Sequence, residues 1–318
     1  MKYVVIVLGA VVMVLAAVKF FIARAVFKKA VLRTDPKSDA ELLASVERRA
    51  GKEGRALFEK ELSYLRSLPS VLLKIKSSDG LELYGKLIEV PNAKGTAILF
   101  HGYRSSGECD FAASVRYFKE LSFNLLIPTQ RAHGDSEGQY ITYGAMESKD
   151  LAYWCRGVES RYGSSHKVLL YGVSMGGSAC LMCMGQKDRP KNVRAMIVDG
   201  AYSSLMDEMR HVIKMRSKLP ALLVEADFWR LCNKKGGFDP LNVEPAASAY
   251  YLTTPTLYIH GDADGFVPYS HAEENFKASA SKYKKLLTLK GGAHAVSFLT
   301  HPELCKDEIS EFLNKHFK

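Results

Sequence analysis

The sequence of 318 residues lacks the patterns that mark several large classes of protein. Its six cysteines stand at irregular spacings, which excludes a small disulfide scaffold and is typical of a reducing compartment. It has no His-Glu-x-x-His or other metal-ligand spacing, and no Gly-x-Gly-x-x-Gly follows its first predicted strands. Internal repeats and low-complexity tracts are also missing from it. We therefore expect a globular chain that uses neither a metal nor an organic cofactor.

The scattered histidines and cysteines have ordinary structural explanations. Cys180 and Cys183 are three residues apart and share one face of a predicted helix, but no second pair completes a metal or redox site. We expect them to be buried core thiols. His101 and His133 follow predicted strands, and we expect them to satisfy hydrogen bonds of the loops there.

Negative charge is scarce at the N-terminus. The net charge of the chain is +10. Residues 1–37 contain one acid, Asp35, beside seven cations: Lys2, Lys19, Arg24, Lys28, Lys29, Arg33 and Lys37. Because this basic excess flanks an apolar segment, it indicates a membrane surface as the partner and not a nucleic acid.

The apolar segment itself runs from Tyr3 to Phe27, with no charge before Lys19. As a helix it would reach about 37 Å, enough to cross a bilayer. We predict a transmembrane anchor over residues 1–29. The alternative is a signal peptide cleaved at Ala23-Arg24-Ala25, which the arginine disfavours. Because more cations follow the segment than precede it, the positive-inside rule places the rest of the chain in the cytoplasm.

Residues 30–69 are rich in charged residues and carry leucine and valine at roughly helical spacing. The apolar positions are Leu42, Val46, Leu57, Leu62 and Leu65. This pattern predicts one or two amphipathic helices, which we interpret as a helical linker between the anchor and the following domain.

From residue 70 the pattern alternates between strands and helices, which predicts an α/β fold with a mostly parallel, doubly wound sheet over 70–318. Strands are expected at 71–76, 81–89, 96–101, 123–128, 167–173, 194–199, 255–260 and 284–289. Helices are expected at 109–121, 144–162, 176–187, 270–280 and 302–316. Residues 201–253 interrupt the alternation, and they are too many for a structureless loop, so they should form an inserted helical lid.

The most informative motif is Gly172-Val173-Ser174-Met175-Gly176, which reads Gly-x-Ser-x-Gly between a predicted strand and a predicted helix. A serine at so sharp a turn is lifted off the sheet, and the glycines remove the Cβ atoms that would block the turn. Its hydroxyl needs a base and an orienting carboxylate before it can act as a nucleophile.

Candidates for both partners follow later strands. Asp264 follows the strand predicted at 255–260, and His294 follows the one at 284–289. Asp262 and Asp199 are rivals for the acid, and His301 is a rival for the base. Asp262 directly follows a glycine and is typical of a turn, whereas His301 begins the last helix. Ser174, Asp264 and His294 each stand just past the carboxyl end of a predicted strand, where α/β sheets bind ligands.

These motifs resemble those of the α/β-hydrolase superfamily, in its serine-hydrolase branch of monoglyceride-lipase-like and serine-aminopeptidase-like enzymes. Four stretches carry the resemblance, which spans roughly residues 70–318: His101-Gly102, 131–138 (Arg-Ala-His-Gly-Asp-Ser-Glu-Gly), 172–177, and 261–268 with His294. The resemblance implies Ser174 as nucleophile, Asp264 as acid and His294 as base. It also implies an oxyanion hole formed by the backbone N–H groups of Tyr103 and Met175.

The resemblance implies acyl transfer through a covalent acyl-serine, and we expect a membrane-anchored esterase or lipase-like enzyme. Its substrate would be a small acyl compound, and the anchor and the Met- and aromatic-rich lid favour a lipid-derived one. The first alternative is a serine peptidase or amidase, for which Asp207, Glu208 or Glu225 could bind an amino group. The second is a non-catalytic binding protein on the same fold, which an intact Ser–Asp–His set argues against.

Overall fold

The computed structural model describes residues 2–216 and 222–318, and a single eight-stranded sheet forms its centre. The strand order is β1-β2-β4-β3-β5-β6-β7-β8, with β1 and β2 antiparallel to their neighbours and the remaining pairs parallel. The strands are β1 (Val71–Lys76), β2 (Glu82–Ile88), β3 (Gly95–Phe100), β4 (Phe123–Pro128), β5 (Val168–Val173), β6 (Val193–Asp199), β7 (Thr256–Gly261) and β8 (Lys284–Leu289). Each predicted strand boundary lies within one residue of the observed one, and the predicted doubly wound α/β fold is confirmed.

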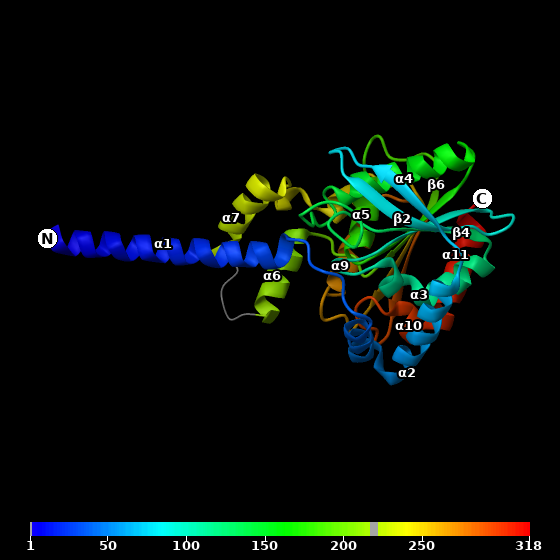
Figure 1. Ribbon diagram of the computed structural model, residues 1–318, viewed down its shortest axis with the longest axis horizontal. Helices are drawn as coiled ribbons and strands as arrows, with labels where there is room; N and C mark the ends of the chain where they lie inside the picture. The colour runs from blue at the N-terminus through cyan, green and yellow to red at the C-terminus, as the bar shows by residue number, and fades with distance from the viewer. Residues whose placement is uncertain (1, 217–221) are drawn as a thin grey trace.

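Helices cover both faces of this sheet (Figure 1). One face carries α2 (Asp39–Ser67), α3 (Gly107–Glu120), α10 (Ser297–Thr300) and α11 (Pro302–His316). The other carries α4 (Glu147–Tyr162), α5 (Met175–Met184), α8 (Pro245–Ala249) and α9 (Ser270–Ala278). Strand β3 shows how the faces are divided, because Ala97 and Leu99 belong to the first core cluster while Ile98 and Phe100 belong to the second.

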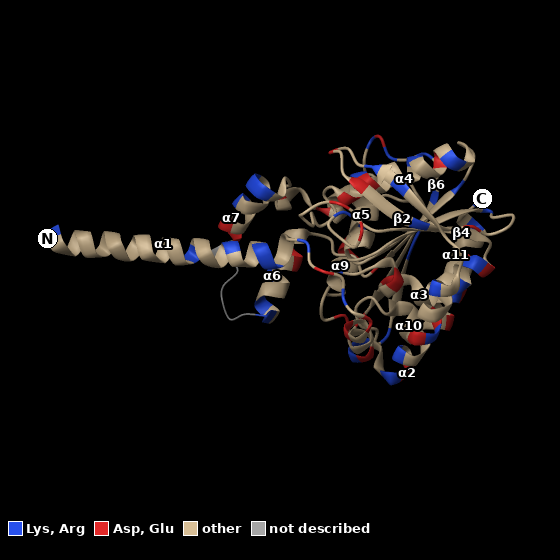
Figure 2. Ribbon diagram, in the orientation of Figure 1, with Lys and Arg blue, Asp and Glu red and all other residues tan. Residues whose placement is uncertain are grey.

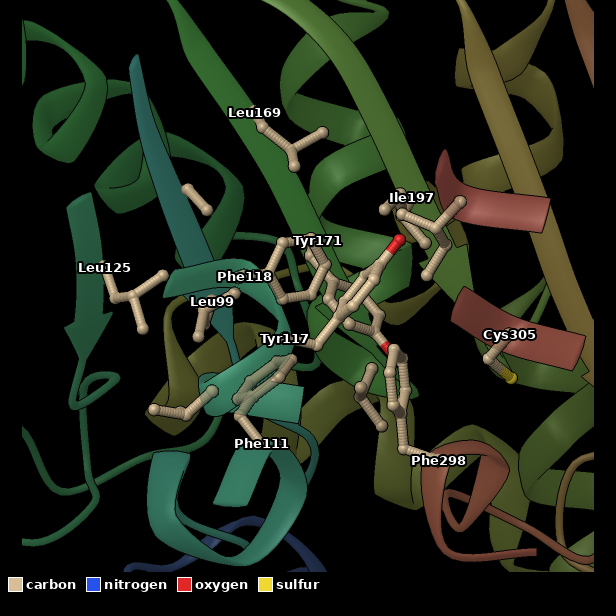
Figure 3. Packing of buried hydrophobic residues seen from close by; sticks show 14 of the residues in the cluster. Leu99, Phe111, Tyr117, Phe118, Leu125, Leu169, Tyr171, Ile197, Phe298 and Cys305 are labelled. Carbon is tan, nitrogen blue, oxygen red and sulfur yellow. The ribbon is translucent and has the colours of Figure 1, made fainter. Parts of the chain in front are cut away.

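Aromatic rings form the centre of the first core cluster. Figure 3 shows Tyr117, Phe118 and Phe298 gathered around Tyr171 of strand β5. Phe111 meets the Tyr171 ring edge-on, with 5.1 Å between centroids. Because Tyr171 lies three residues before Ser174, this packing fixes the strand that leads to the Gly-x-Ser-x-Gly turn.

Helix α4 starts three residues later than the sequence predicts. The preceding turn uses Gly144 at φ +97° and is closed by Glu147, whose carboxylate accepts N–H bonds from Thr142 and Gly144 at 2.8 Å each. A positive φ is incompatible with a helical residue, so the helix can begin only after this turn.

Helix α2 is the amphipathic segment predicted as a linker, and it packs onto the sheet domain. Leu42 and Val46 lie in the first core cluster together with residues of β5 and α3. A kink at Gly51, with φ +71°, shifts the apolar stripe, so that Phe58 is fully buried and Leu57 is only half-buried. The helix therefore contributes to the core as well as connecting the N-terminus to the domain.

Helix α1 (Lys2–Val31) projects from the domain as a long rod (Figure 1). Within the described residues it is the one helix long and apolar enough to cross a membrane. Its large apolar side chains are exposed from Tyr3 to Phe21, whereas Ala23, Phe27 and Val31 are buried. The helix is thus divided into a free half and a half that packs against the domain.

The insertion between β6 and β7 is helical, as predicted. It contains α6 (Leu205–Arg216), α7 (Leu222–Leu231), the π-helical turn η1 (Cys232–Gly236), the 3-10 turn η2 (Pro240–Asn242) and α8. Residues 217–221 of the predicted lid, including Leu219, lie outside the described residues. The helices α6, α7 and η1 are called the cap below, and they flank the C-terminal half of α1 (Figure 1).

Candidate active site

Ser174 occupies a strained turn between β5 and α5. Its φ of 54° and ψ of −122° lie in a region that non-glycine residues rarely adopt, at a cost of about 1–3 kcal/mol. Neighbouring backbone leaves no alternative to glycine at Gly176, where an added Cβ would lie 1.9 Å from the Phe100 carbonyl oxygen. At Gly172 a Cβ would lie 2.4 Å from the Gly176 carbonyl oxygen. The glycines of the motif are therefore required by this close approach of main chains.

The structure brings Ser174, His294 and Asp264 together in one hydrogen-bonded chain. His294 Nε2 lies 3.0 Å from Ser174 Oγ, and His294 Nδ1 donates to Asp264 Oδ2 at 2.6 Å. The three residues come from the ends of β5, β7 and β8, at the edge that the sequence predicts. Such a chain can remove the proton from the serine hydroxyl and stabilise the imidazolium that results.

Asp264 is held in position by its own loop. Its Oδ1 accepts N–H bonds from Phe266 and Val267, both at 2.9 Å. Burial alone would raise the pKa of this carboxyl, but hydrogen bonds from His260 and His294 outweigh burial and hold the pKa well below its usual range. Asp264 therefore stays ionised.

His260 is a member of this site whose role the sequence analysis missed. It is buried at the end of β7, where its Nε2 donates to the Val267 carbonyl at 2.9 Å and lies 3.4 Å from Asp264 Oδ2. Burial alone would lower the pKa of His260, but the Asp264 carboxylate raises it above its usual value. The four-residue spacing between His260 and Asp264, with a turn between them, is the feature of the sequence that could have indicated this contact.

The rival residues are engaged elsewhere. The Asp199 carboxylate is buried and accepts hydrogen bonds from Ser297 Oγ at 2.9 Å and Tyr171 Oη at 3.2 Å. Burial raises the pKa of Asp199 to about 6. Asp262 accepts the Gly291 N–H at 2.6 Å, as a turn residue does, and His301 Nε2 donates to the Lys290 carbonyl at 3.1 Å.

The loop after β3 lies directly beside Ser174. A Cβ on Gly102 would be 3.1 Å from the Ser174 Cβ, so the main chain that leads into Tyr103 passes next to the serine. The loop is fixed on both sides of Tyr103, because the Gly102 N–H donates to Asp110 at 2.7 Å and the Arg104 N–H donates to His133 Nε2 at 3.0 Å. Met175 is the first residue of α5, where N–H groups have no partner within the helix.

His101 and His133 support these loops, as the sequence analysis expects. His101 Nδ1 donates to the Gly102 carbonyl, and its Nε2 accepts the Gln130 N–H at 3.1 Å. Burial lowers the pKa of His101 to about 4, and burial together with His101 lowers that of His133 to about 3. Both rings are therefore neutral at pH 7 and serve as hydrogen-bond partners.

Arg131 explains the charged stretch that follows β4. Its buried guanidinium binds Asp150 at 2.7 and 2.8 Å and Asp79 at 2.8 and 3.0 Å. Its own carbonyl accepts the Nδ1–H of His133, the residue that holds the Arg104 N–H. The motif at 131–138 thus holds the loop beside Ser174 in place through the hydrogen bond from Arg104 N–H to His133.

The cap and the end of α1 cover this edge. His211 Nε2 of α6 lies 3.1 Å from the Gly265 carbonyl oxygen. The ring centroids of Phe266 and His294 are 5.0 Å apart. From α1, the Ala30 carbonyl accepts the hydroxyls of Tyr103 and Tyr143, each at 2.7 Å. The helix that the sequence predicts as an anchor therefore contacts the loop beside Ser174.

The described residues contain no group of three or more His, Cys, Asp or Glu side chains that could hold a metal ion. Cys180 and Cys183 are free and buried, and burial raises the pKa of both thiols. They are core residues, as the sequence analysis expects.

Known proteins with similar sequences and structures agree with this architecture. A family model described as serine aminopeptidase, S33, matches residues 91–231. The uncharacterized protein YqkD of Bacillus subtilis (strain 168) is 24% identical over 319 residues, covering 99% of this chain and 98% of YqkD. YNL320W of Saccharomyces cerevisiae, described as an uncharacterized membrane protein, is 22% identical over 72% of this chain and 75% of its own length.

Among solved structures, the esterase Pf2001 of Pyrococcus furiosus superposes with a TM-score of 0.65 at 22% identity, covering 81% of this chain and 96% of the esterase. The sheet order, the position of Ser174 after β5 and these matches lead to the same conclusion. The chain has the α/β-hydrolase fold.

Proposed function

We propose that this α/β hydrolase is a membrane-anchored serine esterase that cleaves carboxylic esters through an acyl-serine intermediate. The observation that carries the proposal is the hydrogen-bonded chain from Ser174 Oγ through His294 to Asp264. This arrangement supports Ser174 as the nucleophile, His294 as the base and Asp264 as the orienting acid that acyl transfer requires.

In the proposed reaction, Ser174 Oγ attacks the ester carbonyl while His294 Nε2 takes its proton. The N–H groups of Tyr103 and Met175 stabilise the oxyanion, and one such donor is worth about 3–4 kcal/mol of barrier. The C–O bond to the alcohol then breaks, and His294 gives its proton to the departing oxygen. Water, deprotonated by His294, hydrolyses the acyl-serine and regenerates the free hydroxyl.

The contacts of three acidic cap residues favour an ester over a peptide as substrate. Asp207 and Glu225 are both bound to Arg210, at 2.9 and 2.5 Å. Glu208 is buried, and its Oε2 lies 3.5 Å from His271 Nε2. An aminopeptidase needs a carboxylate that is free to bind the substrate amino group, and these three are engaged or covered.

The membrane anchor is supported by the exposed apolar length of α1 and by the description of YNL320W as a membrane protein. Cleavage at Ala23-Arg24-Ala25 would remove Ala23, which is fully buried against the domain, so this alternative is disfavoured. A cytoplasmic location of the catalytic domain stays a prediction. Degradation of that domain by protease added to intact cells would contradict it.

The decisive test is labelling with a fluorophosphonate probe, which reacts with activated serines. We expect the full chain to be labelled and Ser174→Ala to be unlabelled while keeping its thermal stability. No labelling of the unmodified chain would support the non-catalytic alternative, and labelling of Ser174→Ala would mean that another serine reacts. A panel of acyl esters and aminoacyl amides then separates esterase from peptidase.

A further inference from the structure

The free half of α1 has the length of a membrane crossing and stops abruptly. From Tyr3 to Phe21 its large apolar side chains are 44–85% exposed. This stretch extends about 28 Å at 1.5 Å per residue, close to the thickness of the hydrocarbon core. Lys19, two residues before the end of this stretch, is its first charged residue, and its Nζ lies 3.5 Å from Asp227 Oδ2 of the cap.

The other half of α1 is part of the wall around the site. Ala23, Phe27 and Val31 lie in one apolar cluster with Phe228 of the cap and with Met175, the neighbour of Ser174. The chain continues this docking beyond the helix, because the Leu32 carbonyl accepts the Arg104 guanidinium at 3.0 Å and Arg33 N–H donates to Gln139.

These contacts fix the height of the site above the membrane. The Ala30 carbonyl, which binds Tyr103 beside Ser174, lies eleven residues after Lys19. Eleven helical residues rise by about 16 Å. Since both ends of this segment are bound to the domain, the Tyr103 hydroxyl, on the loop beside Ser174, is held at about that distance from Lys19.

Charge on this part of the molecule matches an anionic lipid surface. Exposed cations lie near the docked half of α1 on α1, α6, α7 and η1, and Figure 2 shows blue on α1, α6 and α7. We call the ones without an ion pair to Asp227 or Glu225 the cationic collar: Arg24, Lys28, Lys29, Lys214, Arg216, Lys234 and Lys235. The nearby carboxylates of Asp227 and Glu225 are already paired, with Lys19 and Arg230 and with Arg210. Such cations contribute about 1 kcal/mol each near an anionic membrane.

A small crevice of about 10 Å³ lies between α1 and the cap, with the ion pair of Arg210 and Glu225 in its lining. Val26 lines it from α1, and Met209, Ile213 and Phe228 line it from α6 and α7. Phe228 also belongs to the cluster that reaches Met175 beside Ser174. The crevice has room for about one water, so an acyl chain enters only when these side chains move aside, which the flexible Met209 permits.

We propose that the enzyme takes its substrate directly from the membrane leaflet at which α1 ends. The substrate class is an amphiphilic long-chain ester that parts the side chains lining the crevice between α1 and the cap, until its carbonyl reaches Ser174. This inference rests on the proposed esterase function and adds that the fixed height of the site limits which esters are reached.

The test changes that height without touching the docked segment. Eighteen polar helix-forming residues inserted between Val18 and Lys19 make five turns, so the register of α1 is kept and the domain is raised by about 27 Å. The matched control carries the same insert between Lys2 and Tyr3, on the other side of the membrane. Both are reconstituted in phosphatidylcholine–phosphatidylglycerol vesicles and assayed with soluble p-nitrophenyl acetate and vesicle-embedded p-nitrophenyl stearate.

We expect the insert after Val18 to lower stearate hydrolysis at least about tenfold and to leave acetate hydrolysis within about twofold, while the control insert changes neither. Unchanged stearate hydrolysis by the raised enzyme would overturn the inference. Failure of the proposed function itself looks different, because the unmodified chain would then hydrolyse neither ester and would not react with the fluorophosphonate.

A second variant covers the case in which the insert disturbs folding. Met209→Lys places a charge in the crevice, and Met209→Leu keeps it apolar. We expect the lysine to slow stearate hydrolysis at least about tenfold more than acetate hydrolysis, and the leucine to restore the ratio. An equal effect of the lysine on both esters would overturn the inference.

Discussion

The edge of the sheet that carries Ser174 and the cap that covers it are held together in different ways. At the edge, main chains touch: Gly176 passes under the Phe100 carbonyl, and Asp264 is bound by two backbone N–H groups. At the cap, apolar side chains of α1, α6 and α7 pack together. Backbone contacts tolerate almost no change, whereas side-chain packing tolerates substitutions of similar volume. We therefore expect substitutions at the edge to abolish activity or folding, and substitutions in the cap to change which substrates reach Ser174.

The strongest test of the edge is the acid. Asp264→Asn should lower kcat/KM by about 10⁴-fold, because an amide cannot hold His294 in the required tautomer. Asp262→Asn, two residues away in the same loop, should change it less than about threefold. Steady-state kinetics on a soluble ester measure both, and similar losses in the two variants would mean that Asp264 is not the acid.

The backbone contact at the edge gives the next largest effect. Gly176→Ala would place a Cβ 1.9 Å from a main-chain oxygen, so no side chain can move to make room, and we expect more than about 4 kcal/mol of destabilisation. Gly265→Ala is the matched control, since nothing lies within 4 Å of its added Cβ. Denaturant midpoints compare the two, and equal midpoints would contradict the account of the turn.

Glu208 lies at the boundary between the cap and the edge, and its effect depends on pH. Burial, followed by the charge of Asp264, raises its pKa to about 8. An unfolded glutamate loses its proton near pH 4.3. Between these values the folded protein binds more protons, so its stability falls as pH rises.

Glu208→Gln should remove that penalty and gain up to a few kcal/mol relative to the unmodified protein between about pH 5 and 9. Thermal melts across this range measure the gain, and the exposed Glu303→Gln serves as the control. A gain that does not grow with pH would contradict the assignment of Glu208 as a buried neutral acid.

The smallest effect tests the docking of α1. Tyr103→Phe removes one of two hydroxyls from the Ala30 carbonyl and should cost about 0.5–1.5 kcal/mol. Adding Tyr143→Phe leaves that carbonyl without either donor, so the loss should exceed the sum of the single changes. Because Tyr103 follows Gly102, which lies beside Ser174, kcat should fall more than KM rises. An unchanged kcat in the double variant would separate the docking of α1 from the chemistry.

The same contrast explains how much could be predicted from sequence. Strands were located to within one residue because apolar runs and turn residues are local signals. Ser174, Asp264 and His294 could be selected because each follows such a strand. The apolar stripe of α2 was misjudged at Leu57 because the kink at Gly51 changes the helical register.

The division of α1 into a free and a docked half could not be predicted. The contact that defines it joins Ala30 to Tyr103, 73 residues apart. The cations from Lys19 onward mark a change in composition, but they do not show which residues pack against the domain. His260 was missed for a related reason, because its closeness to Asp264 depends on the turn between them.

The docked half of α1 has a practical consequence for making a water-soluble form of the enzyme. Removal of the whole helix would uncover Phe228, Phe238 and Met175, and an apolar face of that kind promotes aggregation. A shortened protein that begins at Lys19 would lose the exposed apolar stretch up to Val18 and keep the residues that seal the cap. The useful cut therefore lies inside the helix, at its first charge after the membrane.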